Sequence, residues 1–281
     1  MRPSPKSNPI ATIIVVFILC FTIRFIEAFV LRLDETVLGG NVLHKLFGIG
    51  LLIVVLKLYA LSWKDLGFDL RRFYVPALLG LTFGFGRLAL GYAAEYAVLS
   101  ASGENPAFSF YLSGFSLAGS AMKLPTYSIV FTLAFEIINA IMEEGLFRGL
   151  FIKLAQQRLR FAASNLTAAM LFGLWHIVMP IRSYLDGEMP FAAMLFYCIG
   201  YLVLSGIMSL IWGALFGLSG VLWIGLIDHV INNTLIGAIH ITTSSGIDEL
   251  QLVRSIVSQL VLLSVVFVCY ARQRRTKRIL V

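Results

Sequence analysis

The chain has 281 residues, of which 59% are hydrophobic and only 13% charged, and its mean hydropathy is +0.88. Ordinary globular domains carry about 25% charged residues. This composition excludes a soluble enzyme, a secreted disulfide scaffold and a disordered protein. It predicts an all-α, polytopic membrane protein with a single integral membrane domain over residues 1–281. The three cysteines are far apart in apolar runs and predict neither a disulfide framework nor a metal site.

The apolar runs predict eight transmembrane helices. The first begins near Ile10 and continues past Arg24 without a small-x-small cleavage site, so we interpret it as a retained span rather than a signal peptide. The uncharged stretch 189–227 is twice as long as one helix needs and is expected to break at the turn 217–220. The other spans are expected at about 46–62, 73–97, 124–150, 161–180, 190–216, 221–241 and 253–271.

Eight spans place both termini on one side of the membrane, and the basic residues divide unequally between the two sides. Fourteen Lys and Arg fall on the side of the termini and five on the other. This bias predicts that both termini are cytoplasmic. The net charge of +7 therefore indicates contact with anionic membrane lipids, and no nucleic acid is expected as a partner. The amphipathic residues 63–72 are expected on the membrane surface. The expected location is the cell membrane, or the endoplasmic reticulum membrane in a eukaryote.

The densest group of ionisable residues within a predicted span is Glu143, Glu144 and Arg148. An Asp, Lys or Arg at the centre of a membrane helix costs about 2.5–3.5 kcal/mol, so such groups mark functional sites or paired structural locks. Glu144 and Arg148 are four residues apart, share a helix face and can pair. Glu143 is turned about 100° away and lacks this partner. Asn139 and Glu136 extend a polar stripe on the face of Glu143.

Two later spans carry polar residues that could converge with these glutamates. Phe172 and His176 share one face of span 161–180, and His229 and Asn233 share one face of span 221–241. A single membrane histidine more often makes a hydrogen bond between helices than it catalyses a reaction. Two glutamates, two histidines and an asparagine together favour a hydrolytic site.

Three motifs thus occur in order on predicted membrane helices: Glu143-Glu144-x-x-x-Arg148, Phe172-x-x-x-His176 and His229-x-x-x-Asn233. In this order and spacing they resemble the CAAX prenyl protease type II and bacteriocin-processing (CPBP, Abi) family of intramembrane proteases. The resemblance covers residues 126–240, the expected motif-bearing protease core.

This resemblance implies an intramembrane endopeptidase. Its substrate would be a peptide or membrane-associated protein at the cytoplasmic leaflet, including one with a lipidated C-terminus. The implied roles are Glu143 as the base that activates water, His176 as a holder of that water, His229 and Asn233 as the oxyanion hole, and Glu144 with Arg148 as the brace of the site. Donors such as His and Asn suit a developing oxyanion in a dry site.

Other mechanisms and functions stay open. Two His and a Glu can hold Zn²⁺, so a zinc-dependent intramembrane protease is one alternative, although the His-Glu-x-x-His signature is absent. No other cofactor is expected. A serine protease would need Ser219, which lies in a predicted cytoplasmic turn. A membrane transporter or a non-catalytic immunity protein is the alternative from another class, because ionisable groups in spans also serve ion pathways.

The remaining ionisable residues of the spans receive structural interpretations. Arg24 and Glu27 are three residues apart and are expected to pair. Arg87 and Glu95 are expected to extend toward the outer membrane surface. Asp228 adjoins the last motif and is a candidate for supporting it. The residues expected to be solvated near the outer surface are His44 and His240.

Overall fold

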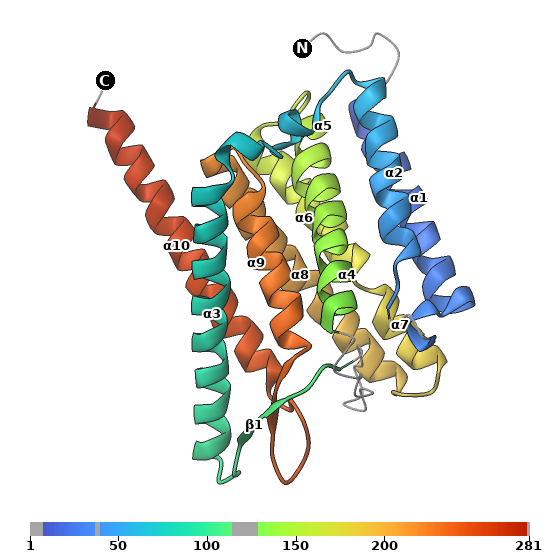
Figure 1. Ribbon diagram of the computed structural model, residues 1–281, viewed down its shortest axis with the longest axis vertical. Helices are drawn as coiled ribbons and strands as arrows, with labels where there is room; N and C mark the ends of the chain where they lie inside the picture. Colours follow the sequence, from blue (N-terminus) through green and yellow to red (C-terminus); the bar gives the residue numbers. More distant parts are fainter. Residues whose placement is uncertain (1–7, 37–39, 114–128, 280–281) are drawn as a thin grey trace.

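The computed structural model describes residues 8–36, 40–113 and 129–279, with side chains up to residue 273, and shows a bundle of long helices (Figure 1). Its elements in chain order are α1 (Pro9–Ile26), η1 (Glu27–Leu31), η2 (Leu33–Glu35), α2 (Leu43–Leu58), η3 (Trp63–Leu66), η4 (Leu70–Arg72), α3 (Tyr74–Ala101), β1 (Ala107–Phe110), α4 (Ile129–Glu143), η6 (Glu144–Phe151), α5 (Ile152–Ala155), α6 (Phe161–Trp175), α7 (Val178–Leu185), α8 (Phe191–Ser219), α9 (Trp223–Ile236), β2 (Ile239–Thr242) and α10 (Gln251–Ile279).

Several apolar helices of this bundle indicate a multi-pass membrane protein. In the described part of the chain, five helical runs are long and apolar enough to cross a membrane: Pro9–Leu31, Tyr74–Ala101, Phe161–Leu185, Phe191–Ser219 and Gln251–Gln273. The other three predicted spans correspond to α2, α9 and the uninterrupted run of α4, η6 and α5 over residues 129–155. α2 and α9 have 16 and 14 residues, so their crossing stays a prediction. The first residues of span 124–150 lie outside the described residues.

One expectation about the helices was wrong. The span predicted to reach residue 241 ends at Ile236, and residues 239–242 form β2, which pairs antiparallel with β1 in a two-stranded sheet. Three of these four residues, Ile239, Ile241 and Thr242, are β-branched and favour a strand, so a short pair of strands accompanies the helices of this all-α fold. The span predicted over 161–180 corresponds to the candidate span Phe161–Leu185, within which α6 ends at Trp175 and His176 lies in a turn before α7.

Glycines allow the short helix α9 to lie close to its neighbours. A β-carbon at Gly80 of α3 would lie 2.7 Å from the carbonyl oxygen of Ile224, and one at Gly84 would lie 3.0 Å from Ile231. Close approach of this kind is the usual role of small residues between membrane helices. α9 therefore packs against α3, α4 and α8, where its side chains meet those of three other helices.

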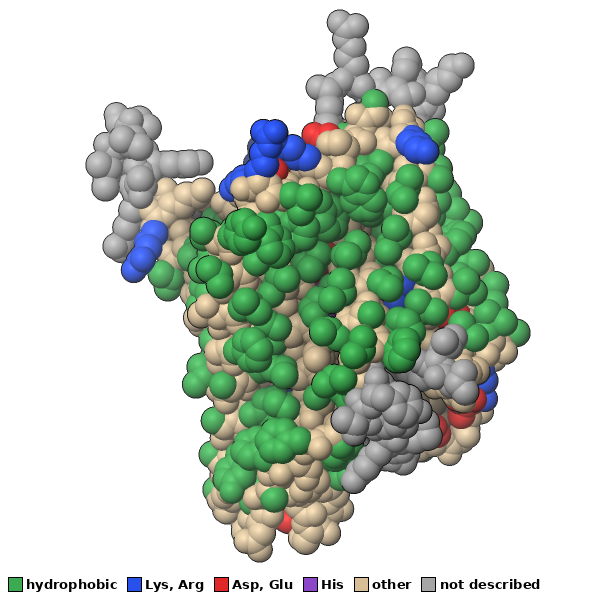
Figure 2. Space-filling view, in the orientation of Figure 1, with side chains coloured by type: hydrophobic (Ala, Val, Ile, Leu, Met, Phe, Trp, Pro, Cys, Tyr) green, Lys and Arg blue, Asp and Glu red, His purple; other side chains and the backbone are tan. Residues whose placement is uncertain are grey.

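One end of the bundle is basic. The segment 63–72 forms two 3₁₀ turns there, with Lys64, Arg71 and Arg72 exposed and Leu66 buried. Trp223 Nε1 donates a hydrogen bond to the carbonyl oxygen of Asp69 at 2.9 Å, which fastens the segment to α9. Figure 2 shows Lys and Arg side chains at this upper end and hydrophobic side chains over the wall of the bundle. The start of α1 and the end of α10 also lie here (Figure 1).

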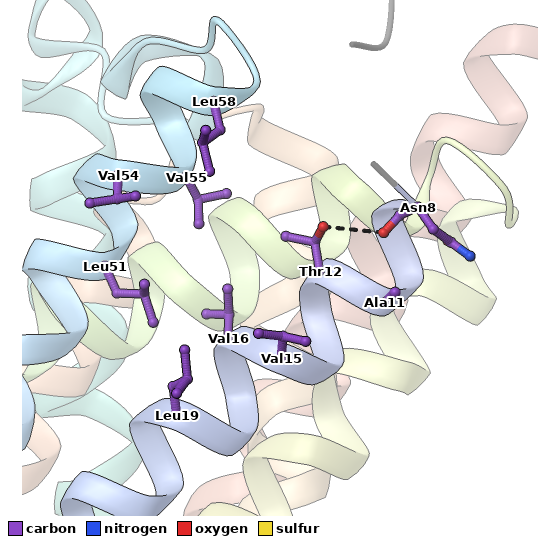
Figure 3. Close-up of a pocket in the computed structure, with 10 residues that line it drawn as sticks. All are labelled: Asn8, Ala11, Thr12, Val15, Val16, Leu19, Leu51, Val54, Val55 and Leu58. Atoms are coloured by element: carbon purple, nitrogen blue, oxygen red, sulfur yellow. Dashed lines mark hydrogen bonds between the residues drawn. The ribbon is translucent and has the colours of Figure 1, made fainter. Parts of the chain in front are cut away.

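An apolar groove of about 360 Å³ lies between α1 and α2 (Figure 3). Its lining residues are Asn8, Ala11, Thr12, Val15, Val16, Leu19, Leu51, Val54, Val55 and Leu58. The groove contains none of the ionisable residues that the motifs single out. A wall of this composition suits the hydrocarbon of a bilayer.

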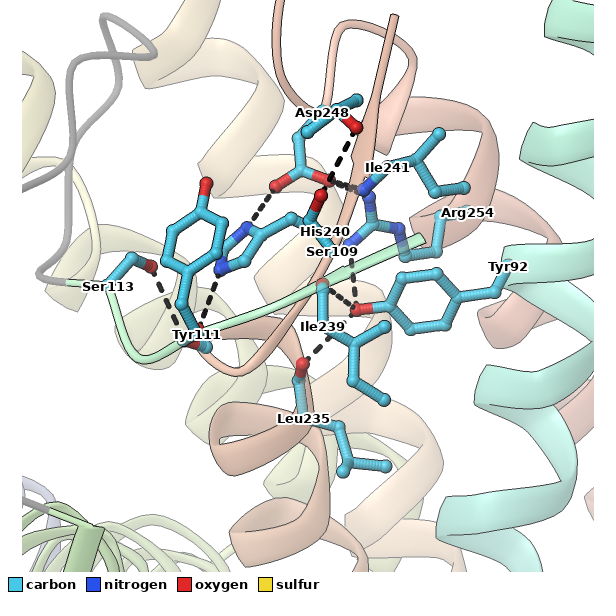
Figure 4. A network of polar contacts seen from close by, with 12 residues as sticks. Tyr92, Ser109, Tyr111, Ser113, Leu235, Ile239, His240, Ile241, Asp248 and Arg254 are labelled. Carbon is cyan, nitrogen blue, oxygen red and sulfur yellow. Dashed lines mark hydrogen bonds and ion pairs between the residues drawn. The ribbon is translucent and has the colours of Figure 1, made fainter. Parts of the chain in front are cut away.

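A polar network closes the opposite end of the bundle (Figure 4). Asp248 accepts hydrogen bonds from Arg254 and from the backbone N–H of Ile241, and it lies 2.7 Å from Nδ1 of His240. His240 is 4% exposed, so the expectation that it is solvated was wrong. Burial raises the pKa of Asp248, but the hydrogen bond with His240 and the charge of Arg254 outweigh burial and hold this pKa below its usual range.

We expect the basic end to face the cytoplasm. In a cysteine-free background, Lys64→Cys and Arg158→Cys should react with a membrane-impermeant maleimide only after cells are permeabilised. Glu188→Cys and Ser245→Cys, at exposed positions near the opposite end, should react in intact cells. A reversed labelling pattern would contradict the positive-inside assignment.

We expect Asp248 to stabilise the fold above about pH 4. A carboxylate whose pKa is depressed in the folded state stabilises it above the unfolded pKa of about 3.9 and loses this effect as the pH falls. The melting temperature of Asp248→Asn should therefore lie below that of the wild type at pH 5–7, and this difference should shrink at lower pH. The exposed neighbour variant Glu249→Gln is the control. A difference that does not change with pH would refute this account.

Candidate active site

Glu144 and Arg148 form the predicted ion pair within one helix. Arg148 Nη1 lies 3.3 Å from Glu144 Oε1, and both side chains are almost completely buried, so this prediction is confirmed. From Glu144 to Phe151 the helix widens to π-helical geometry. Segments of this kind occur frequently at functional sites, because the extra residue per turn changes which side chains point inward.

Aromatic rings surround the guanidinium of Arg148. Its Cζ lies 3.9 Å from the ring centroid of Phe172 and 4.9 Å from that of Trp212. Its nitrogens make no hydrogen bond within the described residues. The charge is therefore balanced by Glu144 and by the faces of two aromatic rings, an arrangement that suits arginine in a dry interior.

His229 of α9 connects the two glutamates. Its Nδ1 lies 3.0 Å from Glu144 Oε1, and its Nε2 lies 3.5 Å from Glu143 Oε2. The imidazole is stacked on the indole of Trp212, with ring centroids 4.4 Å apart and an interplanar angle of 20°. One turn earlier, Gly225 lies beside Glu144, since a β-carbon there would be in van der Waals contact with Glu144 Oε2 at 3.4 Å.

Glu143 has one oxygen bound and one oxygen available. Oε1 accepts a hydrogen bond from Trp175 Nε1 at 2.7 Å and lies 3.7 Å from Arg24 Nη1 of α1. Oε2 accepts no hydrogen bond from any described residue and faces His229. As expected, Glu143 does not share the ion pair of Arg148, but a different arginine lies beside it.

The predicted pair of Arg24 with Glu27 was wrong. Glu27 instead accepts hydrogen bonds from three backbone N–H groups at the start of α2, those of residues 42, 43 and 44, at 2.7–2.8 Å. Its Oε2 also lies 2.5 Å from Nδ1 of His44, which is buried rather than solvated. An acidic side chain satisfies the first N–H groups of a helix well, and this leaves Arg24 free to reach Glu143.

His176 lies at the end of α6, beside the rings of the site. Its Nδ1 lies 2.8 Å from the carbonyl oxygen of Phe172, so Nε2 is the nitrogen that can face a substrate or water. The ring centroid of Phe172 lies 4.5 Å from that of His176 and 6.4 Å from that of His229. Tyr201 of α8 lies parallel to His176 on another side, at 6.2 Å. His176 is also within electrostatic reach of Glu143.

Asn233 lies one turn of α9 beyond His229. Its Nδ2 donates to Glu136 Oε2 at 2.7 Å, and its Oδ1 accepts from Asn232 Nδ2 at 3.1 Å. The structure therefore brings Glu143, Glu144, Arg148 and His229 into direct contact. His176 lies across Phe172, and Asn233 is bonded to Glu136.

Several residues that contact the site were not among the predicted site residues: Arg24, Arg87, Glu136, Trp175, Trp212 and Asp228. Glu136 stood on the predicted polar stripe, and Asp228 adjoins a motif. Arg87 and Glu95 do not reach the outer surface as expected; they are 3% and 0% exposed and pair with Asp228 and Arg254. These pairings join distant helices, so the sequence carries no local signal for them.

The described residues contain no set of ligands that would support a zinc-dependent protease. No group of three His, Cys, Asp or Glu side chains there is arranged to hold a metal ion. His229 directs its two nitrogens at different glutamates, and His176 uses Nδ1 on its own helix. The donor atoms do not converge on one point, as a tetrahedral zinc site requires.

Residues 125–235 match the family model of Rce1-like type II CAAX prenyl endopeptidases. This part of the chain, which includes all three motifs, is a domain of that family, and the predicted resemblance is confirmed. Membership implies an intramembrane protease with a protein substrate. No curated protein matches the sequence.

Removal of the charge of Glu144 should destabilise the protein. Glu144→Gln would leave Arg148 buried without its counter-charge, which costs about 3–5 kcal/mol. Glu143→Gln is the matched control, because Glu143 is equally buried but Arg24 lies farther from it and is partly exposed. Thermal unfolding in one detergent should show a lower melting temperature for Glu144→Gln than for Glu143→Gln. Equal melting temperatures would contradict the bracing role of the Glu144–Arg148 pair.

Proposed function

We propose that the protein is a glutamate-dependent intramembrane endopeptidase that hydrolyses a peptide bond of a membrane-associated protein. The observation that supports this most directly is the available oxygen of Glu143. Oε2 is buried, accepts no hydrogen bond from the described residues, and lies 3.5 Å from a nitrogen of His229. A carboxylate oxygen in this position can take a proton from water.

Glu143 is proposed to act first as a base and then as an acid. Oε2 takes a proton from water as the oxygen of that water attacks the substrate carbonyl carbon. The C–N bond then breaks, and Glu143 returns the proton to the leaving nitrogen. Trp175 donates to Oε1 and so fixes the orientation of the carboxylate. His176 would accept a hydrogen bond from the same water at Nε2, because its Nδ1 is used on Phe172.

His229 is proposed to donate from Nε2 to the oxyanion of the tetrahedral intermediate. Its Nδ1–H is taken by Glu144, so Nε2 carries a hydrogen only when the ring is doubly protonated. Glu144, which is paired with Arg148, lies beside this ring as its counter-charge. The ring of Trp212 stacked on His229 adds a cation–π contact to the charged form.

Asn233 is proposed as the second oxyanion donor. An asparagine amide has two N–H bonds, and Glu136 accepts one of them. The other can point toward the carbonyl of a substrate that lies between α4 and α9. A prearranged donor of this kind typically contributes about 10²–10³ in kcat.

We further propose that the basic end faces the cytoplasm of a cell membrane, and that the substrate reaches the site from that leaflet. Lys and Arg side chains at this end suit anionic lipid headgroups. A lipidated C-terminus would anchor a substrate at the same depth. A transporter or an immunity protein accounts less well for the site, because neither needs a buried carboxylate oxygen left without a hydrogen bond beside a histidine nitrogen.

Comparison of wild-type and Glu143→Gln membranes by proteomics of new protein termini tests the proposal. We expect one or more cleavage products in the wild type that are absent with Glu143→Gln. An internally quenched peptide spanning such a site should be cleaved by the purified wild type about 10²–10⁴-fold faster than by Glu143→Gln.

The exposed loop variant Glu188→Gln is the control and should cleave like the wild type. Equal cleavage by Glu143→Gln and the wild type would show that Glu143 is not the base. Identical sets of termini in both membranes would argue for a non-catalytic function.

A further inference from the structure

Arg87 is a buried arginine that the proposed chemistry does not use. It lies on α3, outside the segment 125–235, and is 3% exposed. Its Nε and Nη2 donate to the two carboxylate oxygens of Asp228 at 2.8 and 3.0 Å, and Nη2 also donates to Asn232 Oδ1 at 3.0 Å. One guanidinium thus holds two residues that are one helical turn apart on α9.

Asp228 connects Arg87 to His229 through Trp212. Asp228 Oδ2 accepts a hydrogen bond from Trp212 Nε1 at 2.7 Å, and this bond fixes the plane of the indole. The same indole is stacked on His229. The orientation of the His229 ring therefore depends on a chain of contacts that begins at Arg87.

Asn232 connects Arg87 to Asn233. Because Asn232 Oδ1 accepts from Arg87, its amide is oriented with Nδ2 toward Asn233 Oδ1, 3.1 Å away. Asn233 in turn directs its own Nδ2 to Glu136. A second chain of contacts from Arg87 thus sets which way the amide of Asn233 faces.

We propose that Arg87 is a positioning residue that aligns both oxyanion donors, His229 through Asp228 and Trp212, and Asn233 through Asn232. This inference rests on the proposed function, which assigns these two donors. Three hydrogen bonds from one planar guanidinium fix α9 in rotation and in register. The ammonium of lysine has no such plane and cannot reproduce the arrangement.

The chain offers a matched comparison in a second buried ion pair that involves α3. Arg254 of α10 is also buried and pairs with Glu95 of α3 at 2.6 Å. Its further contacts are Tyr92 and Asp248, in the network at the end opposite the basic one (Figure 4). A substitution at Arg254 therefore disturbs an equally buried ion pair of α3 without touching a residue of the candidate site.

The first test measures kcat and KM with the peptide from the proteomic comparison. Arg87→Lys should lower kcat about 100-fold, the size expected when oxyanion donors are misaligned. Its KM should change less than about threefold, because the loss falls on the transition state. Arg254→Lys should keep kcat within about threefold of the wild type even where its melting temperature falls.

Two milder variants separate the two chains of contacts. Trp212→Phe removes the indole N–H but keeps an aromatic ring beside His229, and Asn232→Ala frees the amide of Asn233. Each leaves the Arg87–Asp228 ion pair in place. Each should lower kcat about tenfold, less than Arg87→Lys, which affects both donors.

The second test needs no substrate. The chain has four tryptophans, so ¹⁹F NMR of 5-fluorotryptophan-labelled protein can resolve Trp212, assigned by the loss of its signal in Trp212→Phe. Arg87→Lys should shift the Trp212 resonance, and Arg254→Lys should leave it unchanged. If the wild type cleaves nothing, the proposed function fails, and the NMR result still decides whether Arg87 orients Trp212.

Two results would overturn the inference. One is an unchanged Trp212 resonance in Arg87→Lys. The other is an equal loss of kcat in Arg87→Lys and Arg254→Lys, which would show that Arg87 acts only through the stability of the bundle.

Discussion

A charge that is removed from water must find a partner, and in this bundle the partner usually belongs to another helix. Arg87 joins α3 to α9, Arg254 joins α10 to α3, and Glu27 joins the end of the first helix to the start of α2. An unpaired ionised group would cost several kcal/mol in such an environment. The ion pairs therefore leave few alternative ways to dock these helices, whose surfaces are otherwise mostly apolar.

Tryptophan makes a polar site possible within this apolar interior. Its indole presents a large apolar surface and one N–H donor. Trp175 uses that donor on Glu143, and Trp212 uses it on Asp228. The ring faces meanwhile lie against cations, since Arg24 lies 4.4 Å from the ring centroid of Trp175 and Arg148 lies 4.9 Å from that of Trp212. Carboxylates are thus oriented and guanidinium groups stabilised without bulk water.

The sequence predicted those features of the site that depend on one helix. The pair Glu144–Arg148 follows from helical spacing, and the contrast between Glu143 and Glu144 follows from the turn between adjacent residues. The apolar runs likewise predicted the helices. The strand at 239–242 was missed because periodicity does not show whether the few mostly apolar residues after Gly237 are helical or extended.

Contacts between helices could not be predicted in the same way. Arg24 has an acidic neighbour three residues away, yet it lies beside a glutamate more than a hundred residues later. Arg87 and Asp228 are 141 residues apart in sequence. Their pairing is determined by how α3 and α9 dock, which depends on the glycines of α3 and the shape of the whole interface. The spacing of residues along the sequence does not reveal how two helices dock.

The site therefore depends on more of the chain than the segment that carries the motifs. Residues 125–235 supply the groups proposed to react, whereas Arg24 and Arg87 come from helices before that segment. These arginines contact different parts of the site: one lies beside the proposed base, and the other binds the helix of the proposed oxyanion donors. Arg24 contacts Glu143 directly, whereas Arg87 reaches the proposed donors through hydrogen-bonded side chains. A small shift of α1 or α3 would therefore alter the alignment of base and donors. The early helices are thus part of the geometry on which hydrolysis would depend.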